Sequence, residues 1–202
     1  IRKDALYCDP LESDRRRACR TVMDAIFVRL TTWLAPILSF TCEEVWQTRF
    51  PTDDGSVHLE LFRDTPEQWV NAGLAAHMAT VRAFRASVSE SIEPARAAGD
   101  IRSSLEASVT APTDDALVKA LGALSISRQE IYPDPSHPAD TLADYLIVSD
   151  TTLSGTAKRI SVKSLAAHKA YAKCERSWKY FKPENGADIT PRDAAAVKAL
   201  EA

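Results

Sequence analysis

The spacing of apolar residues changes near Gly99, and this change limits the possible folds of the chain. Before Gly99, apolar residues recur every three or four positions over residues 13–34 and 65–92, which is typical of amphipathic helices. After Gly99, short apolar segments alternate with polar residues and are separated by a helical stretch. The sequence therefore predicts an α-helical bundle over residues 1–98, followed by a small mixed α/β domain over residues 99–166.

Local signals place three helices in the first part. A helix over residues 13–34 is expected to have Ser13 as its N-cap. A shorter helix, capped by Ser39 or Thr41, is expected to follow, and a third is expected to begin at Thr65. Four aromatic side chains lie at predicted helix interfaces and are expected in the core: Trp33, Phe40, Trp46 and Phe50.

Short strands and two helices are predicted after Gly99. The strands are expected at residues 105–109, 126–131, 145–148, 160–165 and 178–181, the last two as a hairpin, and the helices at residues 114–124 and 192–201. Thr190 is placed to cap the last helix.

Residues 167–202 have the spacing of a zinc ribbon but lack most of its ligands. A structural zinc needs four ligands, usually as two close pairs, which the spacing would place at Cys174 and Ser177 and at Thr190 and Asp193. Only Cys174 is a good ligand, so we expect a degenerate ribbon with no metal site. Hydrophobic contacts are expected to replace the zinc, from Trp178, Tyr180, Phe181, Ile189, Val197 and Leu200.

This tail resembles the C-terminal end of bacterial isoleucyl-tRNA synthetases, where a segment Lys-Cys-x-Arg-Cys-Trp is followed by Leu-Cys-x-Arg-Cys. The matching residues are Lys173, Cys174, Arg176, Trp178 and Arg192, and the departures are Ser177, Thr190 and Asp193. Residues 1–9 resemble the beginning of that family's anticodon-binding helical domain, and residues 30–46 resemble a characteristic segment within it.

The resemblance implies a helical bundle of the class I synthetase anticodon-binding type, which recognises the anticodon stem-loop of tRNA(Ile), while the ribbon closes over the loop. The family's catalytic motifs, His-Ile-Gly-His and Lys-Met-Ser-Lys-Ser, do not occur in this sequence. We therefore expect a fragment that has no catalytic residues or cofactor and is inactive alone. The parent would be an ATP-dependent isoleucine-tRNA ligase, and the fragment a cytoplasmic monomer that contacts the remainder of the synthetase and no membrane.

Basic residues are concentrated near the end of the chain. Between Gly155 and Lys182 the sequence holds eight Lys and Arg against a single acidic residue, Glu175, and phosphate neutralisation supplies most sequence-independent affinity for RNA. Trp178 could stack on an unpaired base. The residues expected to bind RNA are Arg15, Arg16, Arg20, Lys158, Arg159, Lys163, Lys173, Arg176, Trp178 and Lys179.

Other interpretations of these residues and of the whole chain stay open. The arginines could pair with Glu12, Asp14 and Asp24 on a solvated helix, and the Trp178 indole could pack under the knuckle. The chain could also be a protein-docking module or the tail of a related valine or leucine ligase. An enzymatic activity would require its histidines and acids to converge in a pocket.

Overall fold

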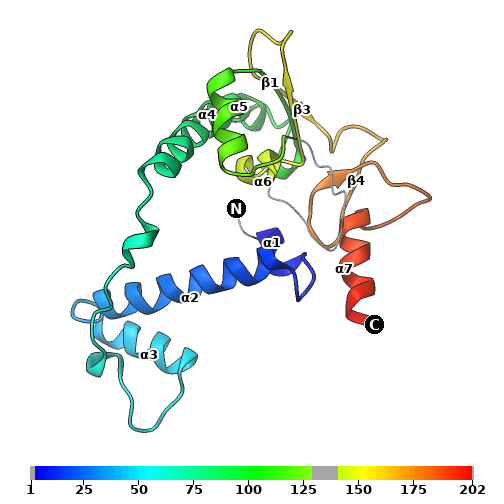
Figure 1. The fold of residues 1–202 in the computed structure, drawn as a ribbon. Helices are drawn as coiled ribbons and strands as arrows, with labels where there is room; N and C mark the ends of the chain where they lie inside the picture. Colours follow the sequence, from blue (N-terminus) through cyan, green and yellow to red (C-terminus); the bar gives the residue numbers. More distant parts are fainter. Residues whose placement is uncertain (1–2, 129–140, 202) are drawn as a thin grey trace. The chain divides into compact units, whose positions relative to one another are not determined.

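The chain is organised as two units, each described here by itself. The computed structural model describes residues 3–128 and 141–201 (Figure 1). One unit comprises residues 17–70, and the other comprises residues 1–16 together with 71–202. The predicted domain boundaries after residues 98 and 166 stay predictions.

The first long helix, α2 (Asp14–Leu34), confirms the prediction made from its apolar spacing. The Ser13 hydroxyl accepts a 3.1 Å hydrogen bond from the backbone N–H of Arg16, so Ser13 caps the helix as predicted. The next helix, α3 (Ser39–Arg49), starts directly after Leu38 without a side-chain cap. The predicted cap by Ser39 or Thr41 is therefore wrong.

A small aromatic core holds the unit of residues 17–70 together. Trp46 is 5% exposed, and its ring centroid lies 6.3 Å from that of Phe27 and 4.8 Å from that of Phe50. Phe40 and Trp33 lie outside this cluster and are 93% and 48% exposed. The core prediction is thus confirmed for Trp46 and wrong for Phe40 and Trp33, because periodicity alone does not show which helix face has a packing partner.

Two short 3₁₀ helices, η1 (Val57–Leu59) and η2 (Glu67–Trp69), follow α3. The Glu43 carboxylate fixes the first, because its Oε2 accepts a 2.7 Å hydrogen bond from Ser56 Oγ and a 2.9 Å bond from the backbone N–H that begins η1. The alternation of Val57, Leu59 and Leu61 predicts an extended segment over residues 51–64, and η1 interrupts it. The predicted helix start at Thr65 is also wrong, since the chain there leads into η2.

The longest helix, α4 (Ala72–Ala97), belongs to the other unit. It begins at an N-cap, where the Asn71 side chain accepts a 2.9 Å hydrogen bond from the backbone N–H of Leu74. It stops before Gly99, whose φ of 80° is left-handed and suits glycine. A 3₁₀ helix, η3 (Ser104–Glu106), then leads into the sheet.

The sheet has three strands in the order β2-β1-β3. The central strand β1 (Ala107–Pro112) pairs in parallel with β2 (Asp150–Ser154) and antiparallel with β3 (Ser161–Ser164). The connection from β1 to β2 carries α5 (Asp115–Ala123) and α6 (Leu142–Leu146). Buried apolar side chains from α4, β1, α5 and α6 form the core, among them Val81, Val88, Val109, Leu117, Leu121 and Leu142.

The strand predicted at residues 145–148 is wrong. Thr141 Oγ1 accepts a 3.2 Å hydrogen bond from the backbone N–H of Asp144 and so caps α6 there, and Ile147 ends that helix with a left-handed φ of 58°. A strand is also predicted over residues 126–131. Within it, Ser127 forms an isolated parallel bridge to Thr141. Residues 129–131 lie outside the described part of the chain. The strand at the start of the sheet and the helix over residues 114–124 are confirmed by β1 and α5.

Two very short strands, β4 (Ala172–Lys173) and β5 (Tyr180–Phe181), form a separate antiparallel pair. The predicted hairpin between residues 160–165 and 178–181 is therefore wrong, because β3 pairs with β1 instead. The last helix, α7 (Pro191–Glu201), confirms the prediction at the end of the chain. None of the helices in the described residues combines the length and apolarity needed to cross a membrane.

Candidate nucleic-acid interface

Trp178, which the sequence predicts to stack on a base, lies in a tight turn between β4 and β5. We call residues 172–181 the terminal knuckle. The backbone N–H of Cys174 donates to the carbonyl oxygen of Lys179 at 2.8 Å, and the N–H of Trp178 donates to the carbonyl oxygen of Cys174 at 2.9 Å. Trp178 has a φ of 62°, a left-handed conformation that costs a bulky residue about 1–3 kcal/mol. The hydrogen bonds of the turn hold this strained backbone in place.

The Trp178 indole lies at the surface, close to two ammonium groups. It is 54% exposed, and the Nζ atoms of Lys3 and Lys173 lie 5.5 Å and 5.9 Å from its ring centroid. Such cation–π contacts steady an exposed ring. The alternative that this indole packs under the knuckle is not what the structure shows. The arrangement has the chemistry of a base-stacking surface flanked by positive charge.

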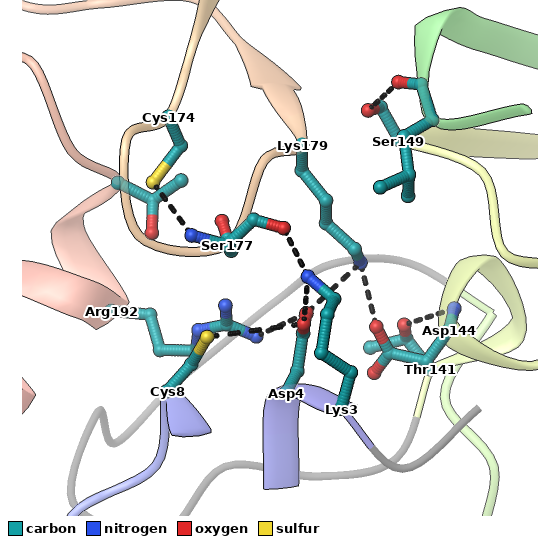
Figure 2. Close-up of polar contacts among 12 residues, drawn as sticks. Lys3, Asp4, Cys8, Thr141, Asp144, Ser149, Cys174, Ser177, Lys179 and Arg192 are labelled. Carbon is teal, nitrogen blue, oxygen red and sulfur yellow. Dashed lines mark hydrogen bonds and ion pairs between the residues drawn. The ribbon is translucent and has the colours of Figure 1, made fainter. Parts of the chain in front are cut away.

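Lys3 is the residue that sequence reasoning missed at this surface. Its Nζ donates to the carbonyl oxygen of Ser177 and pairs with Asp4 Oδ1 at 2.8 Å, so α1 (Lys3–Tyr7) is attached to the terminal knuckle (Figure 2). Lys3 lies within residues 1–9, which carry part of the family resemblance. The resemblance of residues 1–9 could have pointed to Lys3. The contact with Trp178 could not be predicted, because the two residues are far apart in sequence.

The side chain of Lys179 is buried, whereas that of Trp178 is exposed. The Lys179 side chain is 6% exposed, and its Nζ lies 2.6 Å from Asp144 Oδ1 and 4.0 Å from Asp4 Oδ2 (Figure 2). A buried ammonium requires such partners because of its desolvation cost. The prediction that Lys179 contacts RNA is therefore corrected: this residue is part of a buried ion-pair network.

Arg15 also belongs to this network. Its guanidinium is 10% exposed and binds the Asp9 carboxylate through two hydrogen bonds of 2.6 Å, while Nη1 lies 3.4 Å from Asp144 Oδ2. Bidentate pairing of this kind fixes the orientation of the planar guanidinium. The neighbouring Arg16 is half-buried, and its Nη1 donates to the carbonyl oxygen of Asp9 at 3.2 Å. The structure thus gives Arg15 and Arg16 contacts within the protein where the sequence predicted RNA contacts.

Two further arginines connect the end of the chain to its beginning. Arg192 Nη1 lies 3.2 Å from Asp4 Oδ2, and Arg176 Nη2 donates to the carbonyl oxygen of Tyr7 at 3.0 Å. Arg192 is buried and Arg176 is half-buried. For Arg176, predicted to bind RNA, the structure shows a role in holding the knuckle against the end of α1.

Of the residues predicted to bind RNA, some remain at the surface. Besides Trp178, they are Arg20 in the unit of residues 17–70, and Lys158, Arg159, Lys163 and Lys173 in the other unit. Exposure is compatible with phosphate contacts, and their roles stay predictions.

Lowering the pH is expected to destabilise the ion-pair network. Burial acts to raise the pKa of Asp144, but the charge and hydrogen bond of Lys179, with Arg15, outweigh it and hold that pKa below its ordinary value of 3.8. The unfolded chain therefore takes up this proton at a higher pH than the folded chain. The stabilisation is present above about pH 4 and is lost as the pH falls through the folded pKa.

Urea unfolding at a series of pH values checks this expectation. The free energy of unfolding should fall as the pH is lowered below about 4, and less steeply in an Asp144→Asn variant. Identical profiles for the two proteins would contradict the role given to Asp144.

Comparison with known proteins agrees with these features. Residues 1–111 match the family described as the anticodon-binding domain of tRNA ligase. The chain is similar to the isoleucine–tRNA ligase of Gluconobacter oxydans (strain 621H), with 42% identity over 186 residues, covering 92% of this chain and 18% of the relative. The ligase of the same name from Brucella abortus biovar 1 (strain 9-941) is 40% identical over 208 residues, covering 100% of this chain and 20% of the relative.

A third relative is similar over a shorter stretch. The isoleucine–tRNA ligase of Zymomonas mobilis subsp. mobilis is 48% identical over 132 residues, covering 63% of this chain and 14% of the relative. The chain therefore spans no more than about a fifth of the length of these relatives.

Proposed function

The chain belongs to the bacterial isoleucine–tRNA ligases and carries their anticodon-binding domain, and from this premise we propose that it selects tRNA(Ile) by its anticodon stem-loop. Trp178 is the observation that carries the proposal. A large ring is held half-exposed on a strained backbone, close to the ammonium groups of Lys3 and Lys173. A ring that served only the core would be buried.

The proposed mechanism separates positioning from selection. Exposed lysines and arginines hold the RNA backbone, which carries no sequence information, while an unstacked base lies on the Trp178 indole. Lys3 and Lys173 flank the same ring and can also contact the adjacent phosphates. Sequence selection then depends on hydrogen bonds to the splayed anticodon bases.

In the parent enzyme, this recognition would couple the correct tRNA to ATP-dependent attachment of isoleucine. We propose that this chain makes no catalytic contribution of its own and acts with the remainder of the ligase in the cytoplasm. The absence of the two catalytic motifs from the sequence supports this division of labour.

Binding to tRNA(Ile) and to a copy with a substituted anticodon tests the proposal. We expect weaker binding of the substituted copy, because base contacts provide the discrimination, and a steep loss of affinity for both RNAs with increasing salt. Equal affinities would indicate that the protein contacts the RNA backbone but does not recognise the anticodon bases. Undetectable binding to both RNAs at low salt would contradict the proposal.

A protein-docking role is the second candidate. It is favoured by large apolar side chains that are exposed in the unit of residues 17–70, including Ile37 at 77%, Phe40 at 93% and Leu61 at 84%. The remainder of the ligase is the partner that the family membership suggests. An interaction through these side chains should be insensitive to salt, which distinguishes it from binding to RNA.

A further inference from the structure

The four positions with zinc-ligand spacing lie together and are linked by hydrogen bonds, in which Ser177 takes part through its backbone N–H. The Cys174 thiol donates to Asp193 Oδ2 at 3.1 Å, and the Thr190 hydroxyl donates to the same oxygen at 2.8 Å. The backbone N–H of Ser177 donates to Cys174 Sγ at 3.4 Å. Cys174, Ser177 and Asp193 are each 0% exposed, so these contacts form inside the protein.

The side chains at these positions do not fit zinc. Zinc sites use thiolates, imidazoles and carboxylates, whereas Ser177 and Thr190 offer neutral hydroxyls. Among the described residues, no group of three or more His, Cys, Asp and Glu is placed to hold a metal ion. The Arg192 guanidinium also lies 3.2 Å and 3.4 Å from the two Asp193 oxygens, so a cation already occupies the place beside this carboxylate.

We propose that the terminal knuckle is a metal-independent ribbon, organised by the Asp193 carboxylate in place of zinc. The polarity of the site is reversed: a central anion accepts hydrogen bonds from a thiol, a hydroxyl and a guanidinium, where a zinc site has a central cation with anionic ligands. Arg192 extends the cluster by pairing with Asp4 at 3.2 Å. The cluster therefore also attaches α7 to α1.

This cluster differs from the expected hydrophobic replacement of zinc, which is wrong for Trp178 and Leu200. Trp178 and Leu200 are 54% and 53% exposed, and none of the other four expected side chains is fully buried. The side chains of Cys174, Arg192 and Asp193 are, in contrast, buried. Because charge-assisted hydrogen bonds are stronger than neutral ones, a carboxylate is an effective centre for them.

Metal content and thermal unfolding of the 202-residue chain, expressed with added zinc, test the proposal. We expect substoichiometric zinc by mass spectrometry and an unchanged melting temperature with EDTA. Asp193→Ala should lower the melting temperature by roughly 5–15 °C, since it removes one of the carboxylates that lie 3.2 Å from the buried Arg192 guanidinium. One zinc per chain together with destabilisation by EDTA would overturn the proposal.

Cys174→Ser separates the two kinds of site even if Asp193→Ala fails to fold. A serine hydroxyl can still donate to Asp193 but is a poor zinc ligand, so a hydrogen-bonded cluster predicts a folded variant with a small loss of melting temperature. A Cys174→Ser protein that is as unstable as Asp193→Ala would contradict the proposal. Neither measurement involves RNA, so the outcome is independent of the proposed function.

Ser177→Ala is the matched control within the same cluster. Burial raises the pKa of Asp193, but Arg192, Cys174, Thr190 and Ser177 lower it and hold it below its ordinary value. The Ser177 hydroxyl is therefore close enough to act on this carboxylate. That hydroxyl nevertheless makes no well-formed hydrogen bond within the described residues. Its removal should therefore leave the melting temperature nearly unchanged, and a loss as large as that of Asp193→Ala would argue for a role as ligand.

Discussion

Asp144→Ala is expected to lower the free energy of unfolding by about 3–5 kcal/mol, because it removes a buried carboxylate that two buried cations share. Asp144 lies 2.6 Å from Lys179 Nζ and 3.4 Å from Arg15 Nη1. Lys179 Nζ lies further from Asp4 Oδ2, at 4.0 Å. Urea unfolding followed by circular dichroism measures the loss.

Two comparisons make this result specific. Glu93→Ala removes an exposed ion pair with Arg96, of 2.6 Å, and should cost less than about 1 kcal/mol. A double variant, Asp144→Asn with Lys179→Met, removes both members of the buried pair and should be more stable than Asp144→Ala. If Asp144→Ala were as mild as Glu93→Ala, the network would not hold the unit together.

Trp178→Ala is expected to weaken binding of tRNA(Ile) by about 1–3 kcal/mol, roughly 5- to 150-fold, because a base loses its stacking partner. The fold should be retained, since the ring is 54% exposed and few core contacts depend on it. Binding is measured by fluorescence anisotropy of labelled tRNA, and the fold by circular dichroism. Unchanged affinity would remove Trp178 from the interface.

Two further variants distinguish stacking from charge. Trp178→Phe keeps an aromatic face and should retain much of the affinity. Lys163→Ala, on β3, removes one possible phosphate contact and should reduce the slope of log affinity against log salt concentration by about one. Trp178→Ala should leave that slope unchanged. A changed salt slope in Trp178→Ala would indicate that the ring acts by placing Lys3 and Lys173.

Much of the helical structure could be predicted from local signals. The helix after Ser13 and the helix after Thr190 depend on apolar spacing and on capping residues within a few positions. The strand predicted at residues 145–148 failed because Ile147 adopts a left-handed backbone, which is rare for a β-branched residue. Tertiary packing around α6 overrides the local preference there.

The candidate site could be predicted only at its surface. Trp178 and its basic neighbours follow from residue types that are adjacent in sequence. The buried network does not, because Arg192 and Asp4 are separated by 188 positions and Lys179 and Asp144 by 35. A lysine or arginine in a basic segment has the same local signal whether it binds phosphate or an internal carboxylate.

At Trp178, stability and the proposed RNA binding favour different residues, because the backbone there is left-handed. A glycine there would adopt the same angles without steric cost, so replacing the tryptophan would relieve the turn while removing the ring that we propose to meet RNA. Variants screened only for heat resistance should therefore tend to discard this residue. Engineering the domain for robustness requires a simultaneous assay of tRNA discrimination.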